Sequence, residues 1–407
     1  MPLSPPVRPS SSPGKVLFAM CLALAMSALD DTVVNLALPS LQSQLSLSVT
    51  ELQWMVNAYL LPIACLVLPA GTLGDRYGRK RVFTAGLAIF IVASALVGLS
   101  LNGQIAIAGR LLQGIGAAAI LPTSLAILSE AYPNPKARAK AIGIWSGVSG
   151  LALIIGPALG GILVDTFGWR SIFFLNIPLG ALTLWLTHKS VSTRRQHRFS
   201  RLSLKLLRQR SLITVVVTNA LLFFTLVSLL FLFSLFLQQV QGYSAIETGL
   251  RFLPLNIAFI LASLLSGHFA ARIGKRSAIT AGFVIAGVGV LTLTQIQPDI
   301  LYRDLVWRLV TVGFGVGFTL SPLTAAGMDS APPGQAGTVA ALLNTSTRLG
   351  GALGVAMQGG IHIHTAAWMS AIALFTAASL SARYLPAVAK PPLATSPIKQ
   401  TLTTKPP

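Results

Sequence analysis

Twelve long apolar stretches constrain the fold of this chain more than any other feature of its sequence. Crossing the roughly 30 Å hydrocarbon core of a bilayer takes about 20 helical residues. A backbone inside lipid must satisfy its polar groups within the segment, so we expect these stretches to be helices. The sequence therefore predicts an all-α membrane protein with twelve transmembrane helices, at 16–39, 52–73, 82–101, 104–129, 139–163, 171–187, 212–237, 249–271, 277–296, 305–327, 336–360 and 365–384.

The composition excludes soluble classes of protein. Charged residues make up 10% of the 407 residues and apolar residues 53%, whereas a soluble domain carries about 25% charged residues. The mean hydropathy is +0.73. A cytosolic enzyme, a secreted disulfide-rich domain and a disordered protein are all inconsistent with these values. The two cysteines, Cys21 and Cys65, both lie in apolar stretches, so no disulfide framework is expected.

The net charge of +20 is distributed unevenly along the chain. Membrane proteins collect Lys and Arg in their cytoplasmic loops, which explains this charge without nucleic-acid binding. If the amino terminus is cytoplasmic, 24 of the 30 Lys and Arg residues fall in cytoplasmic tails and turns. Outside turns then hold Arg170, Arg251 and Arg303. We therefore predict that both termini are cytoplasmic.

A polar, basic segment divides the apolar stretches into two sets of six. We predict a cytoplasmic tail at 1–15, an N-terminal six-helix bundle at 16–187, a basic cytoplasmic linker at 188–211, a C-terminal six-helix bundle at 212–384 and a second cytoplasmic tail at 385–407.

The two halves repeat each other in sequence. Gly71-x-x-x-Asp75-Arg76-x-Gly78-Arg79-Lys80 follows the second stretch, and Gly267-x-x-x-Ala271-Arg272-x-Gly274-Lys275-Arg276 follows the eighth. Arg110-x-x-x-Gly114-x-Gly116 in the fourth stretch is echoed by Arg308-x-x-x-x-Gly313-x-Gly315 in the tenth. Two related helical bundles around a site at the membrane midplane are typical of secondary transporters.

Four motifs give the chain a resemblance to a known family. It resembles the major facilitator superfamily, and within it the drug:proton antiporters of the EmrB/QacA type. The motifs are Leu29-Asp30-x-Thr32-Val33-Val34-Asn35 in the first stretch, Gly71 to Lys80, Arg110-x-x-Gln113-Gly114 and Gly156-Pro157-x-x-Gly160-Gly161. Most members of that family have fourteen helices, whereas this sequence predicts twelve.

Ionisable residues inside the apolar stretches are the candidates for function. Asp30 and Asp31 are acids at membrane depth, where a charge is costly and usually faces a cavity or a partner. They point about 100° apart on a helix, so they cannot face a cavity equally. Arg110 and Gln113 share one helix face, which must point inward. The resemblance implies proton coupling or substrate binding by Asp30, Asp31, Asn35, Arg110 and Gln113, and weaker claims for Arg308, Asn344 and Arg348.

Two further motifs predict conformational elements. The resemblance implies that Gly71, Asp75, Arg76, Gly78 and Arg79 form a cytoplasmic gate in which Asp75 pairs with an arginine; the alternative is a basic loop that only sets topology. In the second-half copy Ala271 replaces the acid, so a gate there must take its carboxylate from elsewhere. Gly156, Pro157, Gly160 and Gly161 predict a kinked, closely packed helix that acts as a seal or hinge.

The composition predicts a membrane protein, and the resemblance implies that it is a proton-coupled exporter in a bacterial inner membrane. The expected substrate is a small amphipathic or cationic compound, moved as in multidrug efflux. Two alternatives remain open: export of an endogenous metabolite on the same fold, and a membrane sensor that transports nothing. We expect no enzyme activity, no cofactor and no metal site, with the proton gradient as the energy source. The expected partners are the small-molecule substrate and the lipid bilayer, without nucleic acid, and the transport unit is expected to be a monomer.

Overall fold

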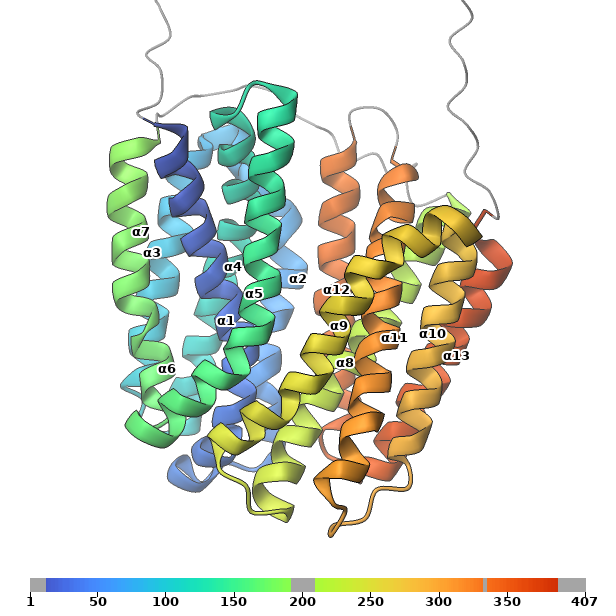
Figure 1. Ribbon diagram of the computed structural model, residues 1–407. Coiled ribbons are helices and arrows are strands. Elements are labelled where there is room, and N and C mark those ends of the chain that lie inside the picture. The colour runs from blue at the N-terminus through green and yellow to red at the C-terminus, as the bar shows by residue number, and fades with distance from the viewer. Residues whose placement is uncertain (1–11, 192–208, 332–334, 387–407) are drawn as a thin grey trace, which may run out of the picture.

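The computed structural model describes residues 12–191, 209–331 and 335–386, and these residues are helical almost throughout (Figure 1). The elements in chain order are α1 (Pro13–Leu45), α2 (Val49–Tyr77), α3 (Arg79–Gly98), α4 (Gly103–Ala131), α5 (Pro135–Phe167), α6 (Arg170–Phe174), α7 (Asn176–Ser190), α8 (Arg210–Leu235), the π-helical turn η2 (Phe236–Val240), α9 (Ala245–Ile273), α10 (Lys275–Leu293), α11 (Tyr302–Asp329), α12 (Ala336–Gln358) and α13 (Ile363–Tyr384).

Ten helical segments of the described chain are long and apolar enough to cross a membrane, with α6 and α7 counted as one segment and α8 and η2 as another. An eleventh, α5, is bent by 46° between Pro135–Ala152 and Ile155–Phe167. Pro157 lies just after this bend, and proline removes a backbone hydrogen bond and kinks a helix. The remaining predicted span, 336–360, coincides with α12, whose 23 residues suffice in length but do not reach the same apolarity.

The helices pack as two groups around two hydrophobic cores (Figure 1). In the first group α1 packs on α5 and α7, and α4 packs on α2 and α3. In the second group α11 packs on α9 and α10, while α8 packs on α12 and α13. The predicted basic linker lies largely outside the described residues, as do Arg8, Lys390, Lys399 and Lys405 of the predicted tails.

The internal repeat is visible in the helix ends and in the packing. Capping boxes start α2 at Ser48 and α9 at Ser244. Two glycines with positive φ, Gly78 at 103° and Gly274 at 86°, make the turns that end α2 and α9.

Glycines of α4 and α11 make equivalent close contacts. A Cβ added at Gly114 would lie 2.4 Å from the Tyr59 carbonyl oxygen of α2, and one at Gly313 would lie 2.2 Å from the Leu255 carbonyl oxygen of α9. The repeated Gly-x-Gly spacing therefore lets the fourth helix of each half lie against its neighbour's backbone.

The two groups of helices touch near one end of the molecule. Gln53 Nε2 donates to the Val355 carbonyl oxygen at 2.9 Å, which joins α2 to α12. Gln239 Nε2 donates to Gln42 Oε1 at 2.6 Å, which joins η2 to α1. Toward the other end α5 and α9 diverge (Figure 1), and a Cβ added at Gly143 or Gly147 of α5 would meet nothing within 4 Å.

Candidate functional site

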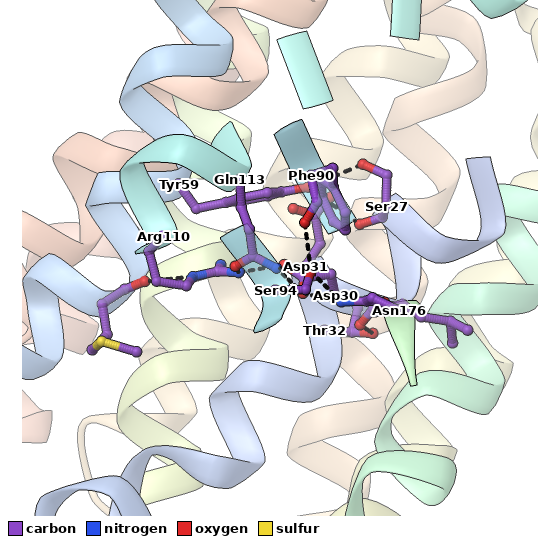
Figure 2. Close-up of polar contacts among 12 residues, drawn as sticks. Ser27, Asp30, Asp31, Thr32, Tyr59, Phe90, Ser94, Arg110, Gln113 and Asn176 are labelled. Carbon is purple, nitrogen blue, oxygen red and sulfur yellow. Dashed lines mark hydrogen bonds and ion pairs between the residues drawn. The ribbon is translucent and has the colours of Figure 1, made fainter. Parts of the chain in front are cut away.

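A buried ion pair between Asp30 and Arg110 lies at the centre of the first group of helices (Figure 2). Arg110 Nη1 donates to Asp30 Oδ2, and the two side chains are 1–2% exposed. Arg110 Nε also donates to the Met55 carbonyl oxygen at 3.0 Å, and its guanidinium lies 4.2 Å from the centre of the Tyr59 ring. Such contacts compensate part of the cost of burying the two charges.

The side-chain amides of Asn176 and Gln113 complete the hydrogen bonds of this pair, and the hydroxyl of Ser94 accepts in turn from Gln113 (Figure 2). Asp30 Oδ1 accepts from Asn176 Nδ2 of α7 at 3.1 Å and from Gln113 Nε2 of α4 at 3.4 Å. Gln113 Oε1 accepts from Arg110 Nη1 at 3.0 Å, and Gln113 Nε2 donates to Ser94 Oγ of α3 at 2.7 Å. The network therefore joins α1, α3, α4 and α7, and it holds Asp30 inside the first group.

Asp31, the next residue on α1, points in a different direction and lines a cavity of about 170 Å³. The cavity lies between the two groups of helices, and its lining combines polar side chains, mainly from α1, α4 and α12, with apolar ones, mainly from α2 and α8. Its lining comprises Asp31, Thr32, Val34, Asn35, Val56, Tyr59, Leu60, Arg110, Phe223, Leu226, Val227, Leu230, Thr347 and Arg348. Arg110 thus contacts both the cavity and the buried Asp30.

An ion pair crosses this cavity from one half to the other. Arg348 Nη1 of α12 donates to Asp31 Oδ2 of α1 at 2.7 Å. Three atoms beside this bond are buried and have no hydrogen-bond partner among the described residues: Asp31 Oδ1, Asn35 Oδ1 and Arg348 Nε. Unpaired buried polar atoms are rare in folded proteins and call for a bound molecule or water.

The predicted site residues therefore fall into two connected places. Asp30, Arg110 and Gln113 form the buried network, while Asp31, Asn35 and Arg348 line the cavity. Arg308 lies apart, donating to the Thr292 carbonyl oxygen at 2.8 Å. Asn344 is exposed and donates to the Ala340 carbonyl oxygen of its own helix at 3.1 Å.

Sequence reasoning missed Tyr59, Ser94 and Asn176. Asn176 carried a usable signal, because an amide inside an apolar stretch must find a partner within the protein. Ser94 and Tyr59 carried none, since both residues are common in membrane helices with no functional role.

The predicted cytoplasmic gate residues lie at the opposite end of the helices from the Gln53–Val355 and Gln42–Gln239 contacts. Asp75 Oδ1 accepts from Arg79 Nη2 at 2.9 Å, and Arg79 Nη1 donates to Glu130 Oε1 of α4 at 2.7 Å. Gly78 makes the turn between α2 and α3, and Arg76 stacks on the Tyr77 ring at 5.2 Å. Gly71 lies on α2 beside Pro122 of α4. In this conformation Asp75 therefore pairs inside its own motif and within its own half.

The second half has an equivalent ion pair built from a different acid. Lys275, which matches Arg79 in the repeat, pairs with Asp329 at the end of α11. Asp329 stands where Glu130 stands at the end of α4. Arg79 pairs with two acids, Asp75 and Glu130. For Lys275, Ala271 stands at the position that matches Asp75, and the pairing is with Asp329 at the position that matches Glu130.

The glycine motif of α5 contacts helices on two sides. A Cβ added at Gly156 would lie 2.1 Å from Thr32 Oγ1, and one at Gly160 would lie 2.7 Å from Val33 Cγ1, so this face packs on α1. On the other face, a Cβ at Gly161 would lie 2.6 Å from the Ile246 Cα of α9.

The backbones of α5 and α9 also meet one turn away. A Cβ added at Gly249 of α9 would lie 2.2 Å from the Pro157 carbonyl oxygen. Nearby, Asp165 of α5 accepts from the backbone N–H groups of Ala245 at 3.1 Å and Ile246 at 2.8 Å, at the start of α9. Arg251, which the sequence analysis counted with the outside turns although it falls at the edge of the predicted stretch 249–271, lies inside α9, in the second turn of that helix.

Known proteins with similar sequences belong to one family of membrane transporters. Residues 20–355 match the Major Facilitator Superfamily. The chain is 33% identical to the multidrug resistance protein Stp of Mycobacterium tuberculosis, over 87% of this chain and 76% of that protein. It is 32% identical to a methylenomycin A resistance protein of Bacillus subtilis, over 92% and 93%.

Solved structures share the fold at low identity. A bacterial homologue of the human lysosomal transporter Spinster, in an inward-facing and unoccupied conformation, matches with a TM-score of 0.76 at 19% identity, over 93% of this chain and 99% of that one. A D-xylose–proton symporter matches with a TM-score of 0.78 at 14% identity, over 92% and 98%. The family match, the relatives and the fold agree, and the chain belongs to the major facilitator superfamily of membrane transporters.

Proposed function

We propose that this protein is a proton-coupled exporter of small amphipathic or cationic compounds, embedded in the bacterial inner membrane with both termini in the cytoplasm. The observation that carries the proposal is the Asp30–Arg110 pair, buried in one half and joined through Arg110 to a cavity between the halves. Relatives named for drug resistance and efflux support export as the direction.

The buried pair provides a group that can exchange a proton. Acidic side chains at membrane depth that face an arginine or a cavity are the groups that relay protons in pumps and transporters. Proton uptake at Asp30 would leave Arg110 without its counter-charge, and Arg110 lines the substrate cavity. Occupation of the cavity and protonation of Asp30 are then linked through one guanidinium.

The conformation fits one state of an alternating-access cycle. With the predicted orientation, the end at which α2 contacts α12 and α5 contacts α9 faces outside, and the end at which α5 and α9 diverge faces the cytoplasm. This state would receive a compound from the cytoplasm. Separation of α5 from α9, and pairing of the halves at the gate motifs, would then open the cavity outward.

Transport into proteoliposomes tests the proposal directly. An imposed pH gradient should drive accumulation of a cationic dye by vesicles that contain the protein. The same vesicles with the gradient collapsed by a protonophore should not accumulate dye. Equal accumulation with and without the gradient would contradict proton coupling, and no accumulation of any tested compound would favour a sensor.

A further inference from the structure

The Asp31–Arg348 ion pair differs from the Asp30–Arg110 pair in where it lies and what it joins. The Asp30 carboxylate is enclosed in one half and has all its partners there. The Asp31 carboxylate is 21% exposed within the cavity, and its partner comes from the other half. A molecule in the cavity can therefore contact this pair directly, whereas Asp30 is not part of the cavity lining.

Around the Asp31–Arg348 pair, the unpaired hydrogen-bond acceptors of the cavity lining outnumber the unpaired donors. Asp31 and Asn35 are one helical turn apart on α1, so they share a face. Asn35 Nδ2 donates to the Asp31 carbonyl oxygen at 3.2 Å, which turns its Oδ1 away from the helix. Asp31 Oδ1 and Asn35 Oδ1 are both buried without a partner, against the single unpaired donor Arg348 Nε. A ligand with an N–H donor satisfies this arrangement better than an anion does.

Charge and shape of the cavity limit the ligand further. Arg110 is already paired with Asp30, so the cavity holds one carboxylate whose counter-ion a ligand can replace. The rest of the wall is apolar and includes Val56, Leu60 and Phe223. A monocation with an apolar body matches both the single carboxylate and the apolar wall, whereas a dication would leave its second charge without a partner carboxylate.

We propose that a monovalent organic cation with an N–H donor binds by replacing Arg348 beside Asp31 and Asn35, and that it thereby breaks the bridge between α1 and α12. This inference rests on the proposed function and narrows its substrate class. Asp31 and Arg348 are then the residues that determine charge specificity, and binding weakens a contact that holds the two halves together.

Equilibrium binding to the purified full chain in detergent tests the inference with three probes of similar size. The probes are phenylbutylamine, phenylbutanol and phenylbutanoate, measured by isothermal titration calorimetry near neutral pH. The wild-type protein should bind the amine most tightly. Asp31→Asn should weaken amine binding by at least about tenfold, the loss expected for a charge-assisted hydrogen bond.

Changes at Arg348 should act in the opposite direction. Arg348→Gln removes the competing cation and should tighten amine binding by about tenfold. The double variant Asp31→Asn/Arg348→Gln should bind the three probes about equally. Arg348→Lys keeps the positive charge and should keep the wild-type order, and it serves as the second variant if Arg348→Gln does not fold.

Matched controls are Arg303→Gln and Asp304→Asn, which make the same charge changes in an exposed pair on α11. Both should leave the order of the three probes unchanged. An unchanged ratio of amine to butanoate affinity in both Asp31→Asn and Arg348→Gln would overturn the inference, as would a wild-type protein that prefers butanoate or does not bind the amine. The binding assay needs no proton gradient, so failure of the proposed transport cycle and failure of this inference are separable.

Discussion

At the scale of single residues, we expect the Asp30–Arg110 pair to affect both stability and transport. The pair is buried and linked to Gln113 and Asn176. Removing one member of a buried ion pair leaves the other charge uncompensated, which typically costs about 3–5 kcal/mol. The same substitution removes the group that we expect to carry the proton.

Asp30→Asn should therefore abolish proton-driven efflux and lower the free energy of unfolding, by about 3–5 kcal/mol if Arg110 stays charged. Efflux is measured in proteoliposomes, and stability by thermal unfolding in detergent. Asp30→Asn/Arg110→Gln should recover much of the stability and none of the transport. Wild-type efflux by Asp30→Asn at pH values on both sides of neutrality would contradict a proton role for Asp30.

The sequence predicted the residues of this site better than their directions. Spacing shows that Asp30 and Asp31 point apart, but it does not say which of them faces the cavity. The structure directs Asp31 to the cavity and Asp30 into the first half. The bridge to Arg348 could not be predicted, because 317 residues separate the partners and only the packing of α12 on α2 and α8 brings them together.

At the scale of elements, the crossing of α5 and α9 depends on glycine. Gly249→Ala would place a Cβ on the Pro157 carbonyl oxygen, 2.2 Å away in the present backbone. The helices must separate to accept it, and overpacking of this kind typically costs about 1–3 kcal/mol. We expect a lower thermal unfolding midpoint and slower efflux.

Gly267→Ala is the matched control, since it makes the same change on the same helix where a Cβ meets nothing within 4 Å. Alanine is favoured over glycine inside a helix by about 1 kcal/mol. Gly267→Ala should therefore leave stability unchanged or slightly higher. Equal effects of the two substitutions would show that the α5–α9 contact is not the cause.

Asp165 adds an electrostatic contact to the same crossing. Its carboxylate accepts from two N–H groups at the start of α9, and an anion at an exposed helix N-terminus contributes about 0.3–1 kcal/mol. Asp165→Asn should therefore shift the balance between conformations away from closure at this end, by about two- to fivefold.

Cysteine accessibility at positions in this crossing measures that shift, in a background without Cys21 and Cys65. Asp299→Asn, in an exposed turn, should not change the labelling. Unchanged labelling in Asp165→Asn would mean that backbone packing alone holds the crossing closed.

Hydropathy located the helices well, because the length of a span is fixed by the membrane. Predicted and observed ends agree within a few residues for most spans, as in 305–327 and Tyr302–Asp329. The sequence did not give the 46° bend of α5, although it identified Pro157, because the size of a bend depends on the neighbouring helices. The helix α12 is less apolar than the others since it carries cavity residues such as Thr347 and Arg348.

At the scale of the whole molecule, successive spans cross the membrane in opposite directions. The side of the membrane on which one loop lies therefore fixes the side of every other loop. Turns at 46–48, 99–102, 168, 241–244 and 359–362 follow odd-numbered spans, and those at 78, 132–134 and 274 follow even-numbered spans. The uneven distribution of Lys and Arg predicts that the second set is cytoplasmic.

Reporter fusions test this orientation. Fusions after residues 45, 103, 168, 243, 299 and 363 should report the outside, and a fusion after residue 200 should report the cytoplasm. A cytoplasmic result at 243 together with an outside result at 168 would show an error of one span in the count. The reverse result at every position would invert the molecule and make the present conformation outward-open.

The glycine contacts between α5 and α9 have a further consequence for the membrane as an electrical barrier. Where Gly249 lies against the Pro157 carbonyl oxygen and Gly161 lies against the Ile246 Cα, the two backbones leave no room for a file of water molecules. Protons and small ions need such a file to cross hydrocarbon. In the proposed cycle, this contact would block such a file along the α5–α9 crossing while the cavity is accessible from the other side, and so help to preserve the voltage across the bilayer.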